Sequence, residues 1–508
     1  MAHTWSHQQE DIFAWFAKDV NFFAGDPHHC YIDANGHLIV RARAGTGKTT
    51  TIIEGANRAP EKRILLCAYN KKIAEELQSR IKNPNCVAKT LHSVGYAAVR
   101  RFREKIQVSF NDDRANKLTD MVCGNHAPDT IKRLVSKLHT KGREIAPHAT
   151  MFGDLTTIAY EFDCIPDEQW ESTFPLEYIE EKALEAMELA SQVKSGETID
   201  GSDMIFLPVR NGWLQKQYDL VIVDEAQDMT IAQLEIAQGV CASRIAVVGD
   251  DRQAIYGFRG ADSGSLDRLK RELGAAELGL TTTYRCAKSI VALAAGLVPD
   301  FEAGPNNAEG SIEEIFPHEL VAAAGPGDFI LSRVNAPLVG TAMKLLRAGK
   351  RAQVAGRDIG KGLVTLVRKF RANSVPDFLR KVESWETKEA SRLQILFDKA
   401  ANGRKATLQA KMEAIHDQAE MLLSLAEGSK NVIEITDRIE NLFTDDGLGA
   451  TGMITLSSVH KAKGLEATKV FILRETLRDY NQEELNIRYV AITRSKTTLV
   501  WVSDRRDS

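Results

Sequence analysis

Eight short runs of apolar residues recur along the chain, and each is bounded by turn residues or by segments with a helical pattern. They cover residues 37–40, 63–69, 218–225, 244–250, 328–333, 453–458, 469–473 and 498–502. The runs are continuous and rich in β-branched residues, which is the pattern of strands buried on both faces. Because helical segments alternate with them, the pattern predicts an α/β fold with parallel sheets.

The eight runs fall into two groups of four, and a mostly helical insertion interrupts each group. A chain of 508 residues is too long for one ordinary core, so several domains are expected. The predicted boundaries are 1–85 and 200–275 for the first core, 86–199 for its insertion, 276–360 and 445–508 for the second core, and 361–444 for its smaller insertion. Apolar residues at helical spacing from Leu408 to Leu422 predict a helix of the second insertion that packs on a neighbour.

Composition and charge place the chain among soluble globular proteins and leave nucleic acid open as a partner. Hydrophobic residues make up 44% and charged residues 26%, which is ordinary for this class. No apolar run reaches the length of about 18 residues that a membrane span needs, and no secretory signal is visible. Seven cysteines without a C-x-x-C pair favour reduced thiols and a cytoplasmic protein, associated with the nucleoid if bacterial. A net charge of −4 argues against a wholly basic surface, but a local basic channel suffices for nucleic acid.

A glycine-rich turn follows the first predicted strand and precedes a helix, in the stretch IVRARAGTGKTTTII (39–53). Such a turn exposes backbone N–H groups to phosphate oxygens. The predicted nucleotide-binding residues are Ala44, Gly45, Thr46, Gly47, Lys48, Thr49 and Thr50. Lys48 is expected to neutralise the β- and γ-phosphates, and the Thr49 hydroxyl to bind Mg²⁺. Ala42 stands where the usual pattern has glycine, and a chance glycine turn is the alternative.

A second acidic strand end is needed for ATP hydrolysis, and YDLVIVDEAQDMT (218–230) supplies it. Asp224 is expected to hold Mg²⁺ through its hydration shell, and Glu225 to orient and deprotonate the attacking water. Acids that merely keep a strand end soluble are the alternative. Together with the phosphate loop, the stretch predicts an ATP hydrolase that uses Mg²⁺.

A third stretch, VGDDRQAIYGFRGAD (248–262), combines two acids at a strand end with aromatic residues in a loop. The acids suggest phosphate and metal chemistry. The rings of Tyr256 and Phe258 suggest stacking on bases, which contributes roughly 1–3 kcal/mol per base whatever the sequence. Both rings could instead be core residues that anchor the loop.

With these motifs in order, nearly the whole chain resembles the superfamily 1 helicases of the UvrD/Rep/PcrA kind. The resemblance implies two RecA-like P-loop NTPase domains with one nucleotide between them. ATP binding would favour a closed form of the two domains, and hydrolysis would let this form open. It also implies 3′→5′ movement on single-stranded DNA, with single/double-strand junctions as substrates and duplex unwinding as the result.

The resemblance assigns further nucleotide contacts outside the phosphate loop. In WSHQQEDIF it points to Gln9 as the reader of adenine, and in LTTTYRCAKSI (280–290) to Tyr284 on adenine and Arg285 at the γ-phosphate. Gln253 of the third motif would sense the γ-phosphate. Glu466 would face the nucleotide sugar. Arg494 would act as an arginine finger, which accelerates hydrolysis on the order of 10³–10⁵-fold.

The resemblance also assigns DNA contacts. The motif CAYNKKIAEEL resembles the first DNA-contacting motif in the form found in the F-box helicase branch, and TLHS (90–93), ILSRVNAPL (330–338) and LSSVHKAKGLEATKVFIL (456–473) resemble later ones. The implied DNA-binding residues are Tyr69, Asn70, Thr90, His92, Tyr256, Phe258, Arg259, Asn335 and His460.

Several features depart from the family pattern and leave alternatives open. Phe258 stands where the best-known members carry tryptophan, and Arg43 stands in the phosphate loop where glycine is usual, facing either ligand or solvent. The basic cluster at 99–105 could contact DNA or be a solvated helix face. The second insertion is much smaller than the mobile subdomain of the long members, which puts strong unwinding in doubt. A translocase that strips proteins from DNA, an ATP-gated DNA clamp and an RNA motor therefore remain alternatives to a helicase.

Overall fold

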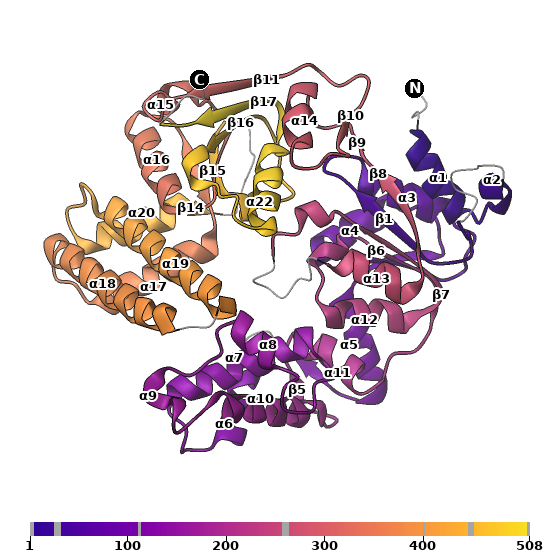
Figure 1. The fold of residues 1–508 in the computed structure, drawn as a ribbon, viewed down its shortest axis with the longest axis horizontal. Helices are drawn as coiled ribbons and strands as arrows, with labels where there is room; N and C mark the ends of the chain where they lie inside the picture. Colours follow the sequence, from indigo (N-terminus) through magenta and orange to yellow (C-terminus); the bar gives the residue numbers. More distant parts are fainter. Residues whose placement is uncertain are drawn as a thin grey trace. The chain divides into compact units, whose positions relative to one another are not determined.

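The computed structural model describes residues 5–24, 32–109, 113–256, 264–399, 402–444 and 452–504. The chain separates into two compact units, Met1–Leu280 and Thr281–Ser508. Each unit contains one large parallel sheet with helices packed against it, as the sequence pattern predicts (Figure 1). All eight apolar runs are strands of these two sheets.

The sheet of the first unit has six parallel strands in the order β3-β2-β6-β7-β1-β8. They are β1 (Leu38–Ala42), β2 (Ile64–Ala68), β3 (Cys86–Thr90), β6 (Tyr218–Val223), β7 (Cys241–Gly249) and β8 (Ala276–Leu280). Successive residues of a strand point to opposite faces. Leu38 and Leu66 therefore join one buried apolar cluster, and Ile39 and Leu65 join another on the opposite face.

Two predicted boundaries differ from the structure, because the two edge strands of this sheet were not predicted. The strand β8 pairs with β1, so residues 276–280 belong to the first unit and not to the second core. The strand β3 pairs with β2, so residues 86–90 belong to the sheet and not to the insertion.

The helices of the first unit pack on its sheet and build its insertion. They are α1 (His7–Phe16), α2 (Val20–Ala24), α3 (Lys48–Arg58), α4 (Lys71–Arg80), α5 (Leu91–Phe102), α6 (Arg114–Cys123), α7 (Asp129–Ile145), α8 (Thr156–Glu161), α9 (Glu168–Glu171), α10 (Leu176–Ser191), α11 (Asp203–Arg210), α12 (Ile231–Val240) and α13 (Ser265–Leu273). Two short strands, β4 (Gln107–Val108) and β5 (Thr198–Ile199), pair with each other, and the 3₁₀ turns η1 (Ala226–Asp228) and η2 (Asp251–Gln253) follow β6 and β7. The insertion has an apolar cluster of its own, from Val99 to Trp213.

The sheet of the second unit has seven strands in the order β11-β17-β16-β12-β15-β13-β14. They are β11 (Ser311–Ile315), β12 (Phe329–Ser332), β13 (Ala352–Ala355), β14 (Phe443–Thr444), β15 (Ile454–Ser458), β16 (Ala467–Leu473) and β17 (Ser495–Val502). The strands β9 (Thr282–Thr283) and β10 (Glu302–Ala303) pair with each other outside this sheet. A 3₁₀ turn, η4 (Arg474–Thr476), follows β16. The helices are α14 (Lys288–Ala295), α15 (Leu320–Ala323), α16 (Ala336–Arg347), α17 (Arg357–Phe370), α18 (Val375–Lys399), α19 (Asn402–Ala426), α20 (Val432–Leu442), α21 (Val459–Ala462) and α22 (Gln482–Ile492).

Among the described residues, helices of the second insertion share a buried apolar cluster with the sheet. Phe378 of α18, Leu422 of α19 and Ile439 of α20 lie in the same buried cluster as Ile330 and Leu456 of the sheet. The helices α18 and α19 pack side by side as a long hairpin (Figure 1), and α19 also packs on α16. The insertion is thus joined to its sheet through shared apolar side chains.

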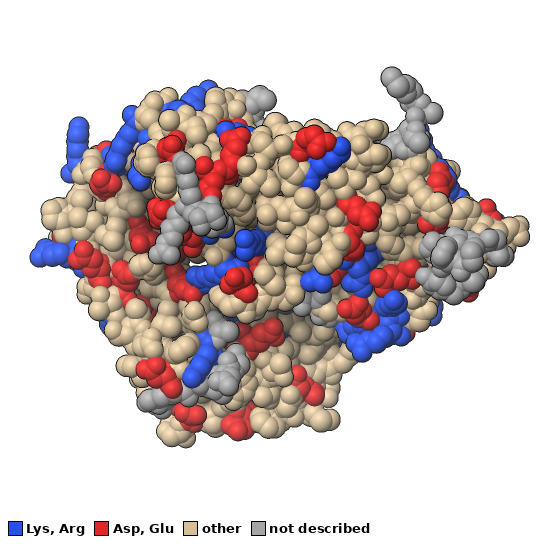
Figure 2. All heavy atoms as spheres, turned by 45° about the horizontal axis from the view of Figure 1, so that its top comes forward, with Lys and Arg blue, Asp and Glu red and all other residues tan. Residues whose placement is uncertain are grey.

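Charged side chains of both signs lie on the surface (Figure 2), and the described cysteines lie in the interior. Over the face drawn in Figure 2, Lys and Arg side chains lie among Asp and Glu side chains. Within the described ranges, no helix is long and apolar enough to cross a bilayer. The described cysteines are free and buried, and burial raises the pKa of thiols such as Cys67, Cys86 and Cys286.

Candidate nucleotide site and nucleic-acid contacts

The phosphate loop joins β1 to α3 and has the backbone that close approach to a phosphate requires. Gly45 and Gly47 have φ angles of 70° and 82°, in the left-handed region where glycine is favoured. The buried Thr46 donates its hydroxyl hydrogen to the carbonyl of Arg43 at 2.9 Å. The loop therefore ends at the first turn of α3, where backbone N–H groups are available to an anion.

Lys48 begins α3 and points toward carboxylates of the neighbouring strands. Its Nζ lies 3.0 Å from Oε2 of Glu225. Burial disfavours the charge on Lys48 most strongly, but the carboxylates of Glu225, Asp250 and Asp224 outweigh it and raise the pKa of the ammonium group. Lys48 is thus a buried, charged group beside the loop, which is the state that binding of phosphate oxygens needs.

Asp224 closes β6 and is buried beside Glu225. Burial and the neighbouring Glu225 carboxylate raise its pKa to about 7, although the Lys48 charge opposes them. A divalent cation would favour the ionised form of such a group. Within the described part of the chain, no group of three His, Cys, Asp or Glu side chains could hold a metal alone. Mg²⁺ is usually bound by one or two protein oxygens together with phosphates and water, and its binding by Asp224 and Thr49 stays a prediction.

Glu225 has a strained backbone and a carboxylate that is held in place. Its φ of 50° lies in the left-handed region, which non-glycine residues rarely adopt and which is concentrated at functional sites. Oε2 accepts hydrogen bonds from Lys48 and, at 2.6 Å, from Nε2 of Gln227. The arrangement keeps the Glu225 carboxylate next to the phosphate loop.

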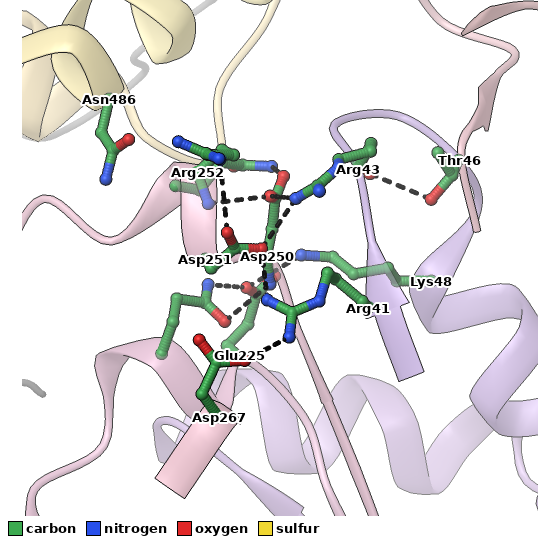
Figure 3. A network of polar contacts seen from close by, with 12 residues as sticks. Arg41, Arg43, Thr46, Lys48, Glu225, Asp250, Asp251, Arg252, Asp267 and Asn486 are labelled. Carbon is green, nitrogen blue, oxygen red and sulfur yellow. Dashed lines mark hydrogen bonds and ion pairs between the residues drawn. The ribbon is translucent and has the colours of Figure 1, made fainter. Parts of the chain in front are cut away.

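The third motif brings a further acid to the same place. Asp250 is fully buried and accepts hydrogen bonds from Nη1 of Arg43 at 3.1 Å and from Nε2 of Gln253 at 2.7 Å (Figure 3). Arg43 also binds Asp251 at 2.7 Å. The open question about Arg43 is therefore answered: its guanidinium group contacts acids of the third motif. Tyr256, further along, is half-buried.

Two predicted DNA-binding residues of this motif, Phe258 and Arg259, lie outside the described residues.

Gln9 lies against the phosphate-loop helix, α3. It is buried in α1, forms a capping box with Ser6, and donates a hydrogen bond from Nε2 to the Thr51 hydroxyl at 3.0 Å. Its contact with adenine stays a prediction.

The second unit brings together three of its predicted nucleotide residues. Nε of Arg285 lies 2.5 Å from Oε2 of Glu466, whose other oxygen binds Lys496 at 2.7 Å. Arg494 is 1% exposed, and its guanidinium group donates to the carbonyls of Val490 and Leu465 at 3.0 and 3.2 Å. Burial, followed by the Arg285 charge, lowers the pKa of Arg494 to about 10.

Arg494 forms no ion pair among the described residues. The Glu466 carboxylate, which pairs with Arg285 and Lys496, acts on the Arg494 charge only from a longer distance. A buried guanidinium group without a direct acidic partner is suited to bind an anion. Tyr284, beside Arg285, is 51% exposed, so its ring is free to stack on a ligand.

Two predicted DNA residues of the first unit, Thr90 and His92, line one surface pocket. Asn70 and Thr90 cap α4 and α5, accepting hydrogen bonds from the backbone N–H groups of Ile73 and Ser93 at 2.9 and 3.2 Å. Tyr69 is 40% exposed. The pocket, of about 710 Å³, lies between these helices and β3, and its lining includes Lys71, Lys89, Thr90 and His92.

The pocket adds two cations that sequence reasoning missed. Lys71 and Lys89 are exposed side chains on its lining, and both are adjacent in sequence to predicted DNA residues, which was the available signal. Burial lowers the pKa of His92, although Glu144 opposes the shift. His92 is therefore suited to hydrogen bonding and not to a charge contact.

The predicted DNA residues of the second unit have mixed surroundings. Asn335 begins α16, and its backbone N–H and its side-chain Nδ2 both donate to Asp417 of α19, at 3.0 and 3.2 Å. His460 lies in α21, directly after β15, and is partly exposed. The Asn335 side chain is thus partly occupied by a contact with the second insertion.

The basic cluster at 99–105 has partners within the first unit. Arg101 donates to the side chains of Gln215 and Gln217. Arg103 donates to the carbonyl of Val193 at 2.9 Å and lies over the ring of Trp213 at 4.9 Å. These contacts favour a structural role for both arginines.

Comparison with known proteins identifies the family. The model of the UvrD/REP helicase N-terminal domain matches residues 27–274, and that of the UvrD-like helicase C-terminal domain matches residues 453–502. F-box DNA helicase protein 1 of Schizosaccharomyces pombe is 24% identical over 93% of this chain and 56% of its own length. F-box DNA helicase 1 of Gallus gallus is 25% identical over 91% and 47%.

A bacterial relative matches a smaller part. ATP-dependent DNA helicase PcrA of Leuconostoc citreum is 25% identical over 58% of this chain and 40% of its own length. The chain spans about half the length of the curated relatives it matches. The two family models together match more than half of the chain, and they lie in the first and second units, respectively. With two α/β units of this kind and a complete phosphate loop, the chain belongs to the UvrD/Rep family of helicases.

Proposed function

We propose that the protein is an ATP-dependent DNA helicase that moves 3′→5′ on single-stranded DNA. The observation that carries this proposal is the cluster of Lys48, Asp224 and Glu225 at the phosphate loop. In it, a charged lysine, a buried acid with a raised pKa and a fixed carboxylate lie together. These are the groups that hydrolysis of a nucleoside triphosphate requires.

The roles of these residues follow from their chemistry. Lys48 binds the terminal phosphates, and Glu225 accepts the proton of the attacking water. Asp224 and Thr49 would hold Mg²⁺, which would supply positive charge near the phosphate oxygens when bound. When ATP binds, Lys48 exchanges its Glu225 partner for phosphate, which frees Glu225 to act on the water.

We propose that Arg285 and Arg494 of the second unit act on the same nucleotide. Support comes from the burial of Arg494, whose guanidinium group forms no ion pair among the described residues, and from the exposed Tyr284 ring beside Arg285. Developing charge on the phosphate is stabilised by such a guanidinium group. ATP would then favour a closed state of the two units, because a ligand shifts an equilibrium toward the state that it binds better.

We propose that single-stranded DNA and single/double-strand junctions are the partners. The pocket with Lys71, Lys89, Thr90 and His92 offers cations and hydrogen-bond donors to a DNA backbone, although Glu75 also lines it and lies 3.8 Å from Lys71. The exposed Tyr69 offers a ring to a base. Repair, recombination, replication and defence against phage all employ such motors.

A translocase that strips proteins from DNA, with little unwinding, is the second candidate. It is favoured by the shared core of the second insertion, since α18, α19 and α20 pack into the sheet cluster and do not form a separate body. Displacement of a duplex strand and displacement of streptavidin from a biotinylated single strand, measured side by side, separate the two candidates.

The decisive experiment is the ATPase rate with and without single-stranded DNA, for the wild type and for Glu225→Gln. The wild type should be stimulated by DNA. The variant should bind ATP normally but hydrolyse it at least about 10²-fold more slowly, the low end of what general-base loss costs. A wild type without DNA stimulation would rule out the motor.

A further inference from the structure

Arg43 is an unusual residue for a phosphate loop, and its side chain is buried. Only 6% of the side chain is exposed. Its Nη1 lies 2.7 Å from Oδ1 of Asp251 and 3.1 Å from Oδ1 of Asp250. Burying a guanidinium group is costly unless acids pair with it, so these two contacts fix where the side chain lies.

Asp250 connects Arg43 to the predicted phosphate sensor. One oxygen of the Asp250 carboxylate accepts from Arg43, and the other accepts from Nε2 of Gln253 at 2.7 Å. The carboxylate is fully buried and has donors on both sides. The Asp250 oxygen that binds Arg43 also accepts the backbone N–H of Arg252 at 3.1 Å. Arg43 and this backbone group therefore hold the Asp250 carboxylate together, and the carboxylate in turn contacts the Gln253 amide.

A second connection leads from Asp250 back to the other end of the phosphate loop. The backbone N–H of Asp250 donates to Oε1 of Gln227 at 3.1 Å. Nε2 of Gln227 donates to Glu225 at 2.6 Å, and Glu225 accepts from Lys48 at 3.0 Å. Arg43 at one end of the phosphate loop and Lys48 at the other are thus joined through the second and third motifs (Figure 3).

We propose that Arg43 is a positioning residue for hydrolysis, which holds Asp250 so that Gln253 is directed at the terminal phosphate of the nucleotide. Arg43 does not touch the nucleotide. Displacement of a reacting or sensing group by about 1 Å can reduce a rate on the order of 10²-fold. The inference rests on the proposed role of Gln253 at the γ-phosphate.

A purely structural role for Arg43 makes a different prediction. If Arg43 only kept the phosphate loop folded, its loss would lower the affinity for ADP and for ATP alike, because both nucleotides bind to this loop. If it positions Gln253, its loss affects ATP, which has the γ-phosphate, and largely spares ADP. The difference between the two nucleotides separates the roles without any need for turnover.

The test uses Arg43→Ala, Arg43→Gln and Arg43→Lys in the full chain. Arg63→Ala is the matched control, because Arg63 also binds an aspartate, Asp219, with two nitrogens, at 3.2 and 2.5 Å, but on the exposed surface of the same unit. Fluorescence titration gives Kd for ADP and for a non-hydrolysable ATP analogue, and steady-state kinetics gives kcat and KM.

For Arg43→Ala we expect an ADP affinity within about threefold of wild type, an analogue affinity about tenfold lower, and kcat about 10²-fold lower. Arg43→Lys should recover part of kcat, because an ammonium group can still pair with Asp250. Arg63→Ala should leave all values unchanged. If Arg43→Ala does not fold, Arg43→Gln, which keeps a donor without the charge, provides the same comparison.

Equal losses of ADP and analogue affinity, or an unchanged kcat in every folded Arg43 variant, would overturn the inference. These outcomes are distinct from failure of the proposed function. A wild type whose ATPase ignores DNA would disprove the motor, while the ADP and analogue affinities would still decide whether Arg43 positions Gln253.

Discussion

At the scale of single residues, Glu225 combines a functional carboxylate with a strained backbone. Glycine adopts the left-handed region without strain, and alanine does not. Both Glu225→Gly and Glu225→Ala remove the carboxylate, so the difference between the two variants measures the cost of the left-handed backbone conformation. We expect Glu225→Gly to be more stable than Glu225→Ala by about 1 kcal/mol in urea unfolding, with both variants inactive. Equal stabilities would show that the backbone relaxes and that no strain is stored.

The residues of the nucleotide site differ in how far sequence alone could reveal them. Lys48, Asp224 and Glu225 belong to local motifs with fixed spacing, and the structure brings Lys48 and Glu225 into contact. The contact between Arg43 and Asp250 was not predicted, because the two residues are 207 positions apart and no periodicity connects them. A signal was present: an arginine in a loop that normally has none needs an acid nearby, and Asp250 directly follows a buried strand.

At the scale of elements, α6 and α7 enclose a buried histidine, His139, whose Nε2 lies 3.1 Å from the carbonyl of Ala115. Burial, followed by the Arg143 charge, lowers the pKa of His139 to about 3. The unfolded chain binds this proton first as the pH falls, so the stabilising effect is complete above about pH 6.5 and is lost toward pH 3. At pH 5 the loss is roughly 2 kcal/mol.

Urea unfolding at pH 7.5 and pH 5 measures this loss. His139→Gln should reduce the difference between the two pH values by roughly 2 kcal/mol, whereas the same substitution at the exposed His126 should leave it unchanged. An undiminished pH dependence in His139→Gln would assign the acid sensitivity to other groups.

The helix α16 is capped by a side chain of the second insertion. Asp417 of α19 accepts hydrogen bonds from the backbone N–H groups of Asn335 and Ala336 at 3.0 and 2.6 Å, and from the Asn335 side chain. Asp417→Ala leaves these donors unpaired and should lower the free energy of unfolding by roughly 1–3 kcal/mol. Asp437→Ala, at an exposed position of α20, is the control and should change it little. No difference between the two would mean that water replaces the Asp417 carboxylate.

Of the strands of the two large sheets that sequence reasoning missed, β3, β8, β11 and β14 lie at sheet edges, and β13 lies inside the second sheet but has only the four residues AQVA. In β3 only Cys86 is buried, and in β8 polar and small residues interrupt the apolar positions. A strand covered on one side only does not need a continuous apolar run, so the pattern that revealed the central strands is absent. The eight predicted strands, in contrast, all lie inside the sheets and were recognisable because both of their faces are buried.

At the scale of the whole molecule, the two insertions are built differently. The first has its own apolar cluster, and the second shares the cluster of its sheet. Native-state hydrogen exchange should therefore show amides of α19 near Leu422 opening with the same free energy as those of β15, in one cooperative unit. Independent opening of α18, α19 and α20, well below the free energy of the sheet, would show that the insertion is a separate body after all.

Because its described native thiols are buried, the protein is suited to selective labelling with fluorescent dyes at introduced cysteines. A maleimide reacts with the thiolate, and the described cysteines are buried, several with a raised pKa. After replacement of Cys30, cysteines introduced at the exposed positions Met151 and Tyr480 would carry a donor and an acceptor dye, one on each unit. Energy transfer between the dyes in single molecules would then follow the two units through each ATP turnover, with the six described native thiols left in place.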